Sequence, residues 1–282
     1  MHMADALLTP AVAGVMYAAS AVVAGASIVE LHKEEKQDLT SAAKKLPTMA
    51  VMSALVFAGQ MINYTIPGTG SSGHLCGGLL LTSVLGPWAG FLSMIVILTI
   101  QCLFFADGGL LALGANVWNM AFYGCFVGYF LIYRPLMRSR CFARRGERAA
   151  NRLKITLASV LGCVLTLQLG AFSVVLETTL SISLSNFVIC LTAWLLGPKF
   201  GTLSVVIYLA IGLIEGLITA AVLLFLYEAR PELLRDVRTG GETAGKVSFK
   251  GTIAVIAIAA VLVGGGLSLL ASGNPDGLEW SL

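Results

Sequence analysis

Charged residues are scarce in this sequence. Of its 282 residues only 12% are charged, 57% are hydrophobic, and the mean hydropathy is +0.87. Soluble domains carry about 25% charged residues, so a water-soluble globule is excluded. The apolar stretches are continuous instead of alternating over about 10 residues, which also excludes a transmembrane β-barrel. The sequence therefore predicts an all-α, polytopic transmembrane helical bundle with about seven spans plus one C-terminal helix.

A membrane span needs about 20 apolar residues, and the chain contains enough long apolar blocks for such a bundle. The third block is interrupted by Gly86-Pro87, which predicts either one kinked span or a short helix followed by a longer one; the charge topology favours the second. Residues 178–198 are expected to form an external or interfacial segment. The apolar blocks lie near 9–31, 47–66, 79–105, 110–133, 155–177, 200–227 and 251–271.

Lysine and arginine are absent from the first 31 residues. A secretory signal peptide begins with a positive segment, so we expect none here and a free amine on Met1. Basic residues gather instead in the loops 32–45 and 134–154, which places both loops in the cytoplasm. We therefore predict a multi-pass protein of the cell (inner) membrane with an extracytoplasmic N-terminus. The net charge of +3 indicates this topology, not binding to nucleic acid.

The chain divides into three parts by composition. Residues 1–228 form an apolar body, 229–250 a polar, Gly-rich cytoplasmic linker, and 251–282 a C-terminal transmembrane helix with a short tail. No CxxC pair occurs among the six cysteines, which predicts reduced thiols in apolar surroundings.

Histidine is equally scarce, with three in the chain. The α-amine, the amide nitrogen of His2 and its Nδ1 can surround one metal ion with three coplanar nitrogens. His74, in the Gly-rich external loop 67–78, is the candidate for the fourth. Planar nitrogen coordination suits Ni(II) or Cu(II) better than Co(II). The alternative is an accidental His2 and a solvated His74, and Cys76 is a further candidate ligand.

The sequence lacks a complete motif for nucleotide hydrolysis. Gly68-x4-Gly73 has the spacing of a phosphate-binding loop but is followed by His74-Leu75, so no ATP hydrolysis is expected. The sequence predicts no catalytic or cofactor-binding residues and no enzyme activity. Amide and carboxyl groups within apolar spans are candidates for function or for hydrogen bonds between helices. Asn63, Asp107 and Asn116 are predicted to support the metal ligands; the other such groups are Gln101, Asn119, Gln168, Glu177 and Glu215.

Several blocks occur together in a familiar order, and with them the sequence resembles the CbiM/NikM family. This family comprises the substrate-binding subunits (S components) of energy-coupling-factor (ECF) transporters for nickel and cobalt. The blocks are Met1–Leu8 with Pro10, Pro67–Leu75, Leu85–Gly90, Gln101 with Asp107–Gly109, Leu113–Asn116, and Ile211–Ala220.

The resemblance implies an N-terminus inserted into its own bundle. It implies a metal held by the Met1 amine, the amide and imidazole of His2, and His74. It also implies a transmembrane coupling (T) subunit and two ATPase subunits as partners in the lipid bilayer. No cofactor is implied; Ni(II) or Co(II) is cargo.

The end of the chain carries a second resemblance. Residues 274–280 resemble the PDGLE signature of the small companion subunit (NikN/CbiN-like) that aids metal loading. One departure from the family is Tyr208, where many relatives have histidine.

The sequence thus predicts the substrate-capturing subunit of an ATP-driven importer of Ni(II), with Co(II) as the lesser candidate. The alternative is a secondary, ion-coupled metal or cation permease that uses the intramembrane carboxylates Asp107, Glu177 and Glu215. The H-x4-D-H signature of nickel permeases is absent, which counts against it. A metal-independent membrane scaffold is a third class.

Overall fold

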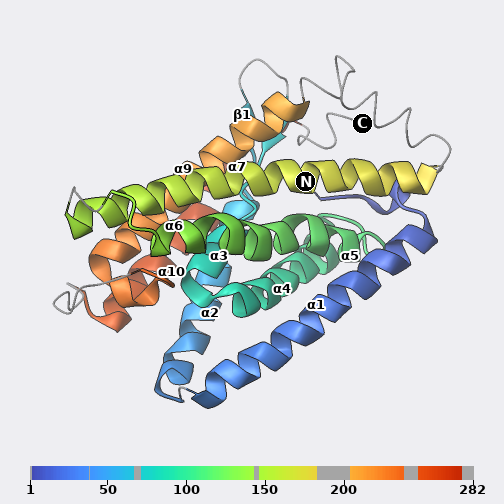
Figure 1. Ribbon diagram of the computed structural model, residues 1–282. Coiled ribbons are helices and arrows are strands. Elements are labelled where there is room, and N and C mark those ends of the chain that lie inside the picture. Colours follow the sequence, from blue (N-terminus) through green and yellow to red (C-terminus); the bar gives the residue numbers. More distant parts are fainter. Residues whose placement is uncertain are drawn as a thin grey trace.

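The structure, a computed structural model, describes residues 2–37, 39–66, 71–142, 146–182, 204–237 and 247–274. It is a helical membrane protein, as predicted (Figure 1). The α-helices are α1 (Pro10–Gln37), α2 (Leu39–Gln60), α3 (Gly78–Leu85), α4 (Pro87–Phe105), α5 (Leu113–Asn116), α6 (Arg134–Arg138), α7 (Glu147–Ile182), α9 (Ser204–Ala229) and α10 (Phe249–Gly265).

Shorter elements complete the fold. A 17-residue π-helical stretch, η2 (Val117–Tyr133), joins α5 to α6 in one continuous helix. Short 3-10 turns lie at η1 (Asp5–Leu7), η6 (Pro231–Leu233) and η7 (Leu267–Leu270). Strands β1 (Tyr64–Ile66) and β2 (Ser71–Gly73) pair antiparallel, with Tyr64 opposite Gly73.

Five helices within the described ranges are long and apolar enough to cross a membrane. They are Pro10–Lys36, Pro87–Phe105, Leu113–Arg138, Glu147–Ile182 and Val205–Ala229. Three further segments fall short of this standard: α2 contains Lys44, Lys45 and Pro47 in its N-terminal half, α3 has 8 residues, and α10 has 17. The count of about seven spans plus one C-terminal helix stays a prediction.

The expected break in the third apolar block is confirmed. Gly86 has φ +89°, a value that suits glycine, and Pro87 starts α4 where its missing N–H costs no helical hydrogen bond. All eight residues of α3 are buried. A short helix flanked by irregular chain is tolerated at membrane depth when protein surrounds it, because lipid then meets no unpaired backbone groups.

Charged side chains from distant segments meet at one end of the bundle. Glu34, from the end of α1, pairs with Lys45 and with Arg235, and Arg235 also donates to the carbonyl of Leu85 at the end of α3. Asp236 pairs with Arg138 at the end of α6. The basic segments that the charge pattern assigns to the cytoplasm are largely helix ends in the structure and lie together, and we call this end the inner end.

Close helix packing depends on small residues where α7 and α9 meet. A Cβ on Gly212 would lie 2.8 Å from the Cα of Val164, and one on Gly216 would lie 2.6 Å from the Cα of Val160. Spaced four apart, these glycines let the two backbones approach, as small residues do between membrane helices. Large apolar side chains such as Val22, Phe104 and Val261 are exposed, as on a surface that faces lipid.

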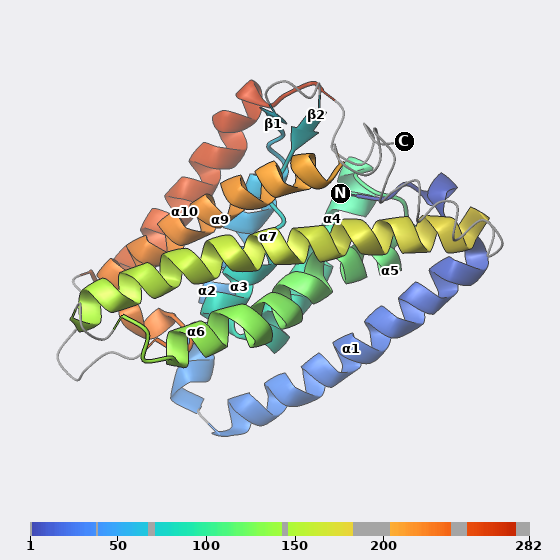
Figure 2. The same cartoon turned by 45° about the horizontal axis from the view of Figure 1, so that its top comes forward.

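One sequence prediction falls partly outside the described residues. The segment 178–198 was expected to be external or interfacial, but α7 continues as helix to Ile182. Residues 183–198 are not among those described. Figure 2 shows α7 running along nearly the whole length of the bundle.

Candidate metal centre

Met3 anchors the N-terminal segment inside the bundle. The Met3 side chain is fully buried in a small core with Leu8, Ala13 and Ala115. The Met3 N–H donates to Asn116 Oδ1 at 2.7 Å, while its carbonyl accepts from Asn116 Nδ2 at 3.2 Å. The carbonyl also accepts the N–H of Gly109 at 2.9 Å. The backbone just after His2 is therefore fixed through both main-chain polar groups of Met3.

This anchoring brings His2 against His74. Their rings stack with centroids 5.1 Å apart and an interplanar angle of 22°. Both residues are buried, as are Gln101 and Asn116. The structure thus brings together the two histidines that the sequence singled out, although 72 positions separate them in the chain.

The two ring nitrogens of His2 face different acceptors. Nδ1 lies 3.1 Å from Asp107 Oδ1, and Nε2 lies 3.2 Å from Gln101 Oε1. A neutral imidazole carries one N–H, so the two oxygens compete for one ring proton. With the proton on Nε2 and donated to Gln101, Nδ1 offers its lone pair to a metal. With the proton on Nδ1 and donated to Asp107, that lone pair is absent.

His74 follows the β-hairpin and is held by its own loop. Its Nδ1 lies 3.0 Å from the carbonyl of Leu75. A carbonyl can only accept, so Nδ1 carries the proton and Nε2 of the neutral ring carries the lone pair. A neighbouring acceptor fixes the tautomer of metal-binding histidines in this way.

Two glycines shape the loop around His74. A Cβ on Gly73 would come within 2.5 Å of the Ile211 side chain, and Gly77 has φ +78°. Glu215 from the middle of α9 accepts the N–H groups of Cys76 at 3.0 Å and of Gly77 at 2.9 Å. A buried carboxylate therefore anchors the loop directly after His74. The sequence placed Glu215 among the intramembrane polar groups and the carboxylates of the alternative permease, but did not predict this contact.

Asp107 lies at the outer rim of the histidine pair. It follows Ala106, whose φ of +54° turns the chain sharply at the end of α4, and it precedes Gly108 at φ +86°. Burial would raise the pKa of Asp107, but the hydrogen bond from His2 and electrostatic attraction from His2 and His74 outweigh it. The pKa is therefore held below its usual value.

A second polar cluster contacts the Met3 side chain through Asn119 of η2, which is hydrogen-bonded to Glu177 of α7. Asn119 Nδ2 lies 2.8 Å from Glu177 Oε2 and 3.6 Å from Met3 Sδ, and Ser173 Oγ lies 3.4 Å from Glu177 Oε1. The sequence identified Asn119 and Glu177 as polar residues in apolar spans, but not their link to the N-terminal segment. The signal was present in the unusual residue type; the pairing depends on how η2 and α7 pack.

The C-terminal segment reaches the same region. Helix α10 packs against α2 and ends beside the hairpin (Figure 2). The Ser272 N–H donates to the carbonyl of Asn63 at 2.7 Å, and Thr65 donates to Ser272 Oγ at 2.8 Å. Ser72 donates to the carbonyl of Asn274 at 2.8 Å. The chain just before the PDGLE residues thus contacts the hairpin that leads to His74.

The remaining predicted site residues are placed as follows. Met1 and the PDGLE residues 275–282 lie outside the described residues. Asn63 contributes its main-chain carbonyl to Ser272, so its support of the metal ligands stays a prediction. Tyr208 is buried in α9, and Cys76 lines a small internal void with Glu215 and Asn119. Cys102, Cys125, Cys141 and Cys163 carry free thiols.

Within the described part of the chain, no three side chains of His, Cys, Asp or Glu gather as they would around a metal ion. A metal between His2 and His74 would therefore depend on main-chain nitrogen as well. Such a donor set is rich in nitrogen, and it lies at the end of a membrane bundle away from the charged inner end. Fold and site together are those of a membrane protein whose buried histidine pair suits a transition-metal ion.

Comparison with known proteins agrees with this class. Residues 2–233 match the model of the family CbiM, "Cobalt uptake substrate-specific transmembrane region", and residues 250–282 match the PDGLE domain. The chain therefore belongs to the CbiM family of metal-transport proteins; it is not an enzyme. Its C-terminal part is a PDGLE segment, as the sequence indicated.

Relatives support the same assignment. A putative fused nickel transport protein NikMN of Archaeoglobus fulgidus is 39% identical over 94% of this chain and 79% of its own length. A cobalt transport protein CbiM of Sorangium cellulosum is 33% identical over 67% of this chain and 76% of its own. A crystal structure of a truncated transition metal transporter superposes with a TM-score of 0.60 at 30% identity. It covers 81% of this chain and 99% of that one.

Proposed function

We propose that this protein is the substrate-capturing subunit of an ATP-driven ECF importer for Ni(II), with Co(II) as the lesser candidate. The observation that carries the proposal is the stacked, buried pair of His2 and His74. The Met1 amine, the His2 amide nitrogen, His2 Nδ1 and a His74 nitrogen would supply four donors. Planar nitrogen-rich coordination suits Ni(II), and only a strongly binding ion readily displaces an amide proton.

The surroundings of the site fit this donor set. Asn116 fixes the Met3 peptide, so the backbone leading back to His2 has a defined direction. Gln101 Oε1 lies 3.2 Å from Nε2 of His2 and can accept its proton in the tautomer that leaves a lone pair on Nδ1. Glu215 holds the loop after His74. Each of the two histidines is thus positioned by neighbouring hydrogen bonds before a metal arrives.

The direction of transport follows from topology. Basic residues at the inner end support a cytoplasmic position for that end, and the histidine pair would then face the extracytoplasmic side. Capture of the metal would occur there. A transmembrane coupling subunit and two ATPase subunits would then reorient this subunit and release the metal inward. Residues 1–228 would form the metal-binding domain, 229–250 the cytoplasmic linker, and 251–282 the C-terminal helix with the PDGLE motif.

The carboxylates fit this proposal better than an ion-coupled permease. Glu215 uses both oxygens on main-chain N–H groups, and Glu177 is bound by Asn119 and Ser173. Asp107 contacts His2. Each carboxylate therefore has a local partner in organising the N-terminal segment or the His74 loop. A permease would need them to exchange ions in series along the bundle.

The test is Ni(II) titration by calorimetry of the full-length protein in detergent, with its N-terminus confirmed by mass spectrometry. The matched variant carries one extra alanine before Met1, which moves the amine out of chelate ring size but leaves both histidines. We expect saturable Ni(II) binding by the first protein and its loss in the second. Equal binding by both would contradict the role of the amine, and no binding by either would contradict metal capture.

A further inference from the structure

Among the described side chains that contact the histidine pair, Asp107 is the most exposed to water. The His2 side chain is 5% exposed and that of Asp107 is 36% exposed. The other polar residues in contact with this pair or with Met3 are buried: His74 is 6% exposed, Gln101 0% and Asn116 2%. A hydrated cation that arrives from water therefore meets the Asp107 carboxylate before either imidazole.

The same carboxylate restrains the nitrogen that must bind the metal. Asp107 Oδ1 lies 3.1 Å from Nδ1 of His2. Because a carboxylate accepts hydrogen bonds, this contact favours the ring proton on Nδ1 and so removes its lone pair. A cation that binds the Asp107 carboxylate neutralises its charge and so weakens its hydrogen bond with Nδ1 of His2. The proton is then favoured on Nε2, where Gln101 Oε1 accepts it at 3.2 Å.

We propose that Asp107 is the entry ligand for the cation, a transient carboxylate site that receives the hydrated metal and passes it to Nδ1 of His2. The inference rests on the proposed function, since the cation is the same divalent metal. Binding of the metal to Asp107 weakens the contact that holds the ring proton on Nδ1, so the same step frees the Nδ1 lone pair. A carboxylate exchanges a divalent cation readily, whereas four nitrogen donors in a plane hold Ni(II) firmly. Asp107 therefore governs how fast the metal is captured, and its loss changes the affinity only through the association rate.

Asp5 provides a matched control on the same face. It is an exposed carboxylate in η1, and its Oδ1 accepts the Ala112 N–H at 3.0 Å. It contributes negative charge near Asp107, but the structure gives it a main-chain partner instead of His2. Substitution by asparagine at either position removes the charge and retains an amide oxygen that can accept the same hydrogen bond. The two variants therefore separate a specific entry ligand from general negative charge at the outer end.

The experiment mixes Ni²⁺ alone with the full-length protein in a stopped-flow instrument and follows the d–d absorbance of bound Ni(II). Association and dissociation rates are measured for wild type, Asp107→Asn, Asp107→Glu and Asp5→Asn, at low and high salt. We expect Asp107→Asn to lower the association rate roughly tenfold or more, within the range of electrostatic steering. Its dissociation rate should stay unchanged and its salt dependence should shrink. Asp107→Glu retains the charge and should restore the rate, and Asp5→Asn should change it little.

Other outcomes overturn the entry-ligand proposal. An unchanged association rate in Asp107→Asn would show that the metal reaches His2 by another path. A faster dissociation with an unchanged association rate would make Asp107 a permanent ligand or a positioning residue. Equal slowing by Asp5→Asn would reduce the effect to general charge. If wild type binds no Ni²⁺, the proposed function itself fails; if wild type binds and the Asp107 variants match it, the entry-ligand proposal alone fails.

Discussion

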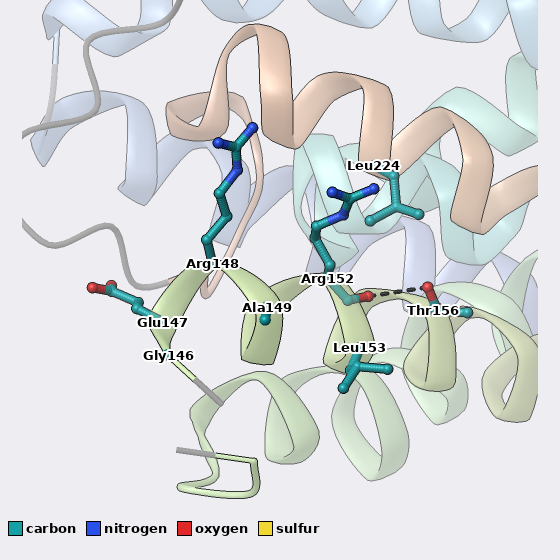
Figure 3. Close-up of a pocket in the computed structure, with 8 residues that line it drawn as sticks. All are labelled: Gly146, Glu147, Arg148, Ala149, Arg152, Leu153, Thr156 and Leu224. Carbon is teal, nitrogen blue, oxygen red and sulfur yellow. Dashed lines mark hydrogen bonds between the residues drawn. The ribbon is translucent and has the colours of Figure 1, made fainter. Parts of the chain in front are cut away.

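The two ends of α7 hold polar groups in opposite ways. Near its end at Ile182, Glu177 and Ser173 are buried. Glu177 accepts hydrogen bonds from Ser173 and from Asn119, which also contacts Met3. At its start, Arg148 and Arg152 are exposed and lie beside Glu228 of α9. Their side chains line an open groove of about 900 Å3, with Leu224 on its far wall (Figure 3).

This difference teaches what each end is built to bind. Buried polar groups with fixed partners preserve one geometry, as the recognition of a small ion requires. Exposed ion pairs are screened by solvent and rearrange easily, which suits contact with a large partner in water. The proposed assignment of the metal to the outer end follows this contrast. Variants at one end should therefore leave the other end's property intact.

The largest expected effect is on metal binding at the outer end. His2→Ala removes the imidazole and breaks the chelate rings that use it, so bound Ni(II) should fall to background. Arg152→Ala, at the other end of the bundle, should retain full occupancy. Elemental analysis of both purified proteins after incubation with Ni²⁺ measures this. Loss of metal in both variants, or in neither, would contradict the proposal that only the outer end binds the metal.

His74→Ala should have the next largest effect. It leaves the Met1 amine and the two His2 nitrogens as a three-donor remnant. The dissociation constant for Ni(II), from calorimetry, should rise by more than the roughly 10–100-fold that is typical when an outer hydrogen-bond partner of a ligand is lost. His32→Ala is the matched control, because His32 lies in the charged segment at the end of α1. An affinity unchanged in His74→Ala would exclude it as a ligand.

Asn116→Ala tests preorganisation instead of coordination. It deletes both hydrogen bonds to the Met3 peptide and should weaken Ni(II) binding by about 10–100-fold, the range for partners that orient ligands. Asn151→Ala is the control, since Asn151 is also buried but donates to Tyr227. Equal losses in the two variants would point to general destabilisation, and their circular dichroism melting curves would show it.

The pH dependence of Ni(II) affinity sharpens the same contrast. Imidazole protonates near about 6.5 and an α-amine near about 7.7 to 8, and protons compete with metal for these lone pairs. Affinity should therefore fall as pH decreases through this range, most steeply where both groups gain protons. Calorimetric titrations at several pH values measure it. A flat profile would mean that neither group binds the metal.

Much of this architecture could be predicted from sequence, because its signals are local. Apolar blocks, basic loops and Gly86-Pro87 each act within a few residues, and the helices and the break at α3 follow them. The two histidines were identified because the residue type is rare. Contacts that depend on packing could not be predicted: the double hydrogen bond of Asn116 to Met3 joins segments 113 residues apart. No pattern along the chain specifies that two such segments meet.

The smallest expected effect concerns the C-terminal segment at the hairpin. Ser272→Ala removes the hydroxyl that accepts from Thr65 but keeps the N–H donated to Asn63. The contact is exposed, so its loss should cost about 0.5 kcal/mol, the lower limit for a hydrogen bond. We expect faster amide hydrogen exchange in the hairpin, measured by mass spectrometry, with Ni(II) affinity nearly unchanged. Ser248→Ala, at the start of α10, is the control, because its hydroxyl accepts from Gly251 and leaves the hairpin contacts intact. If Ser272→Ala leaves exchange in the hairpin unaltered while Ser248→Ala increases it, the packing of α10 against α2, not the segment after α10, restrains the approach to His74.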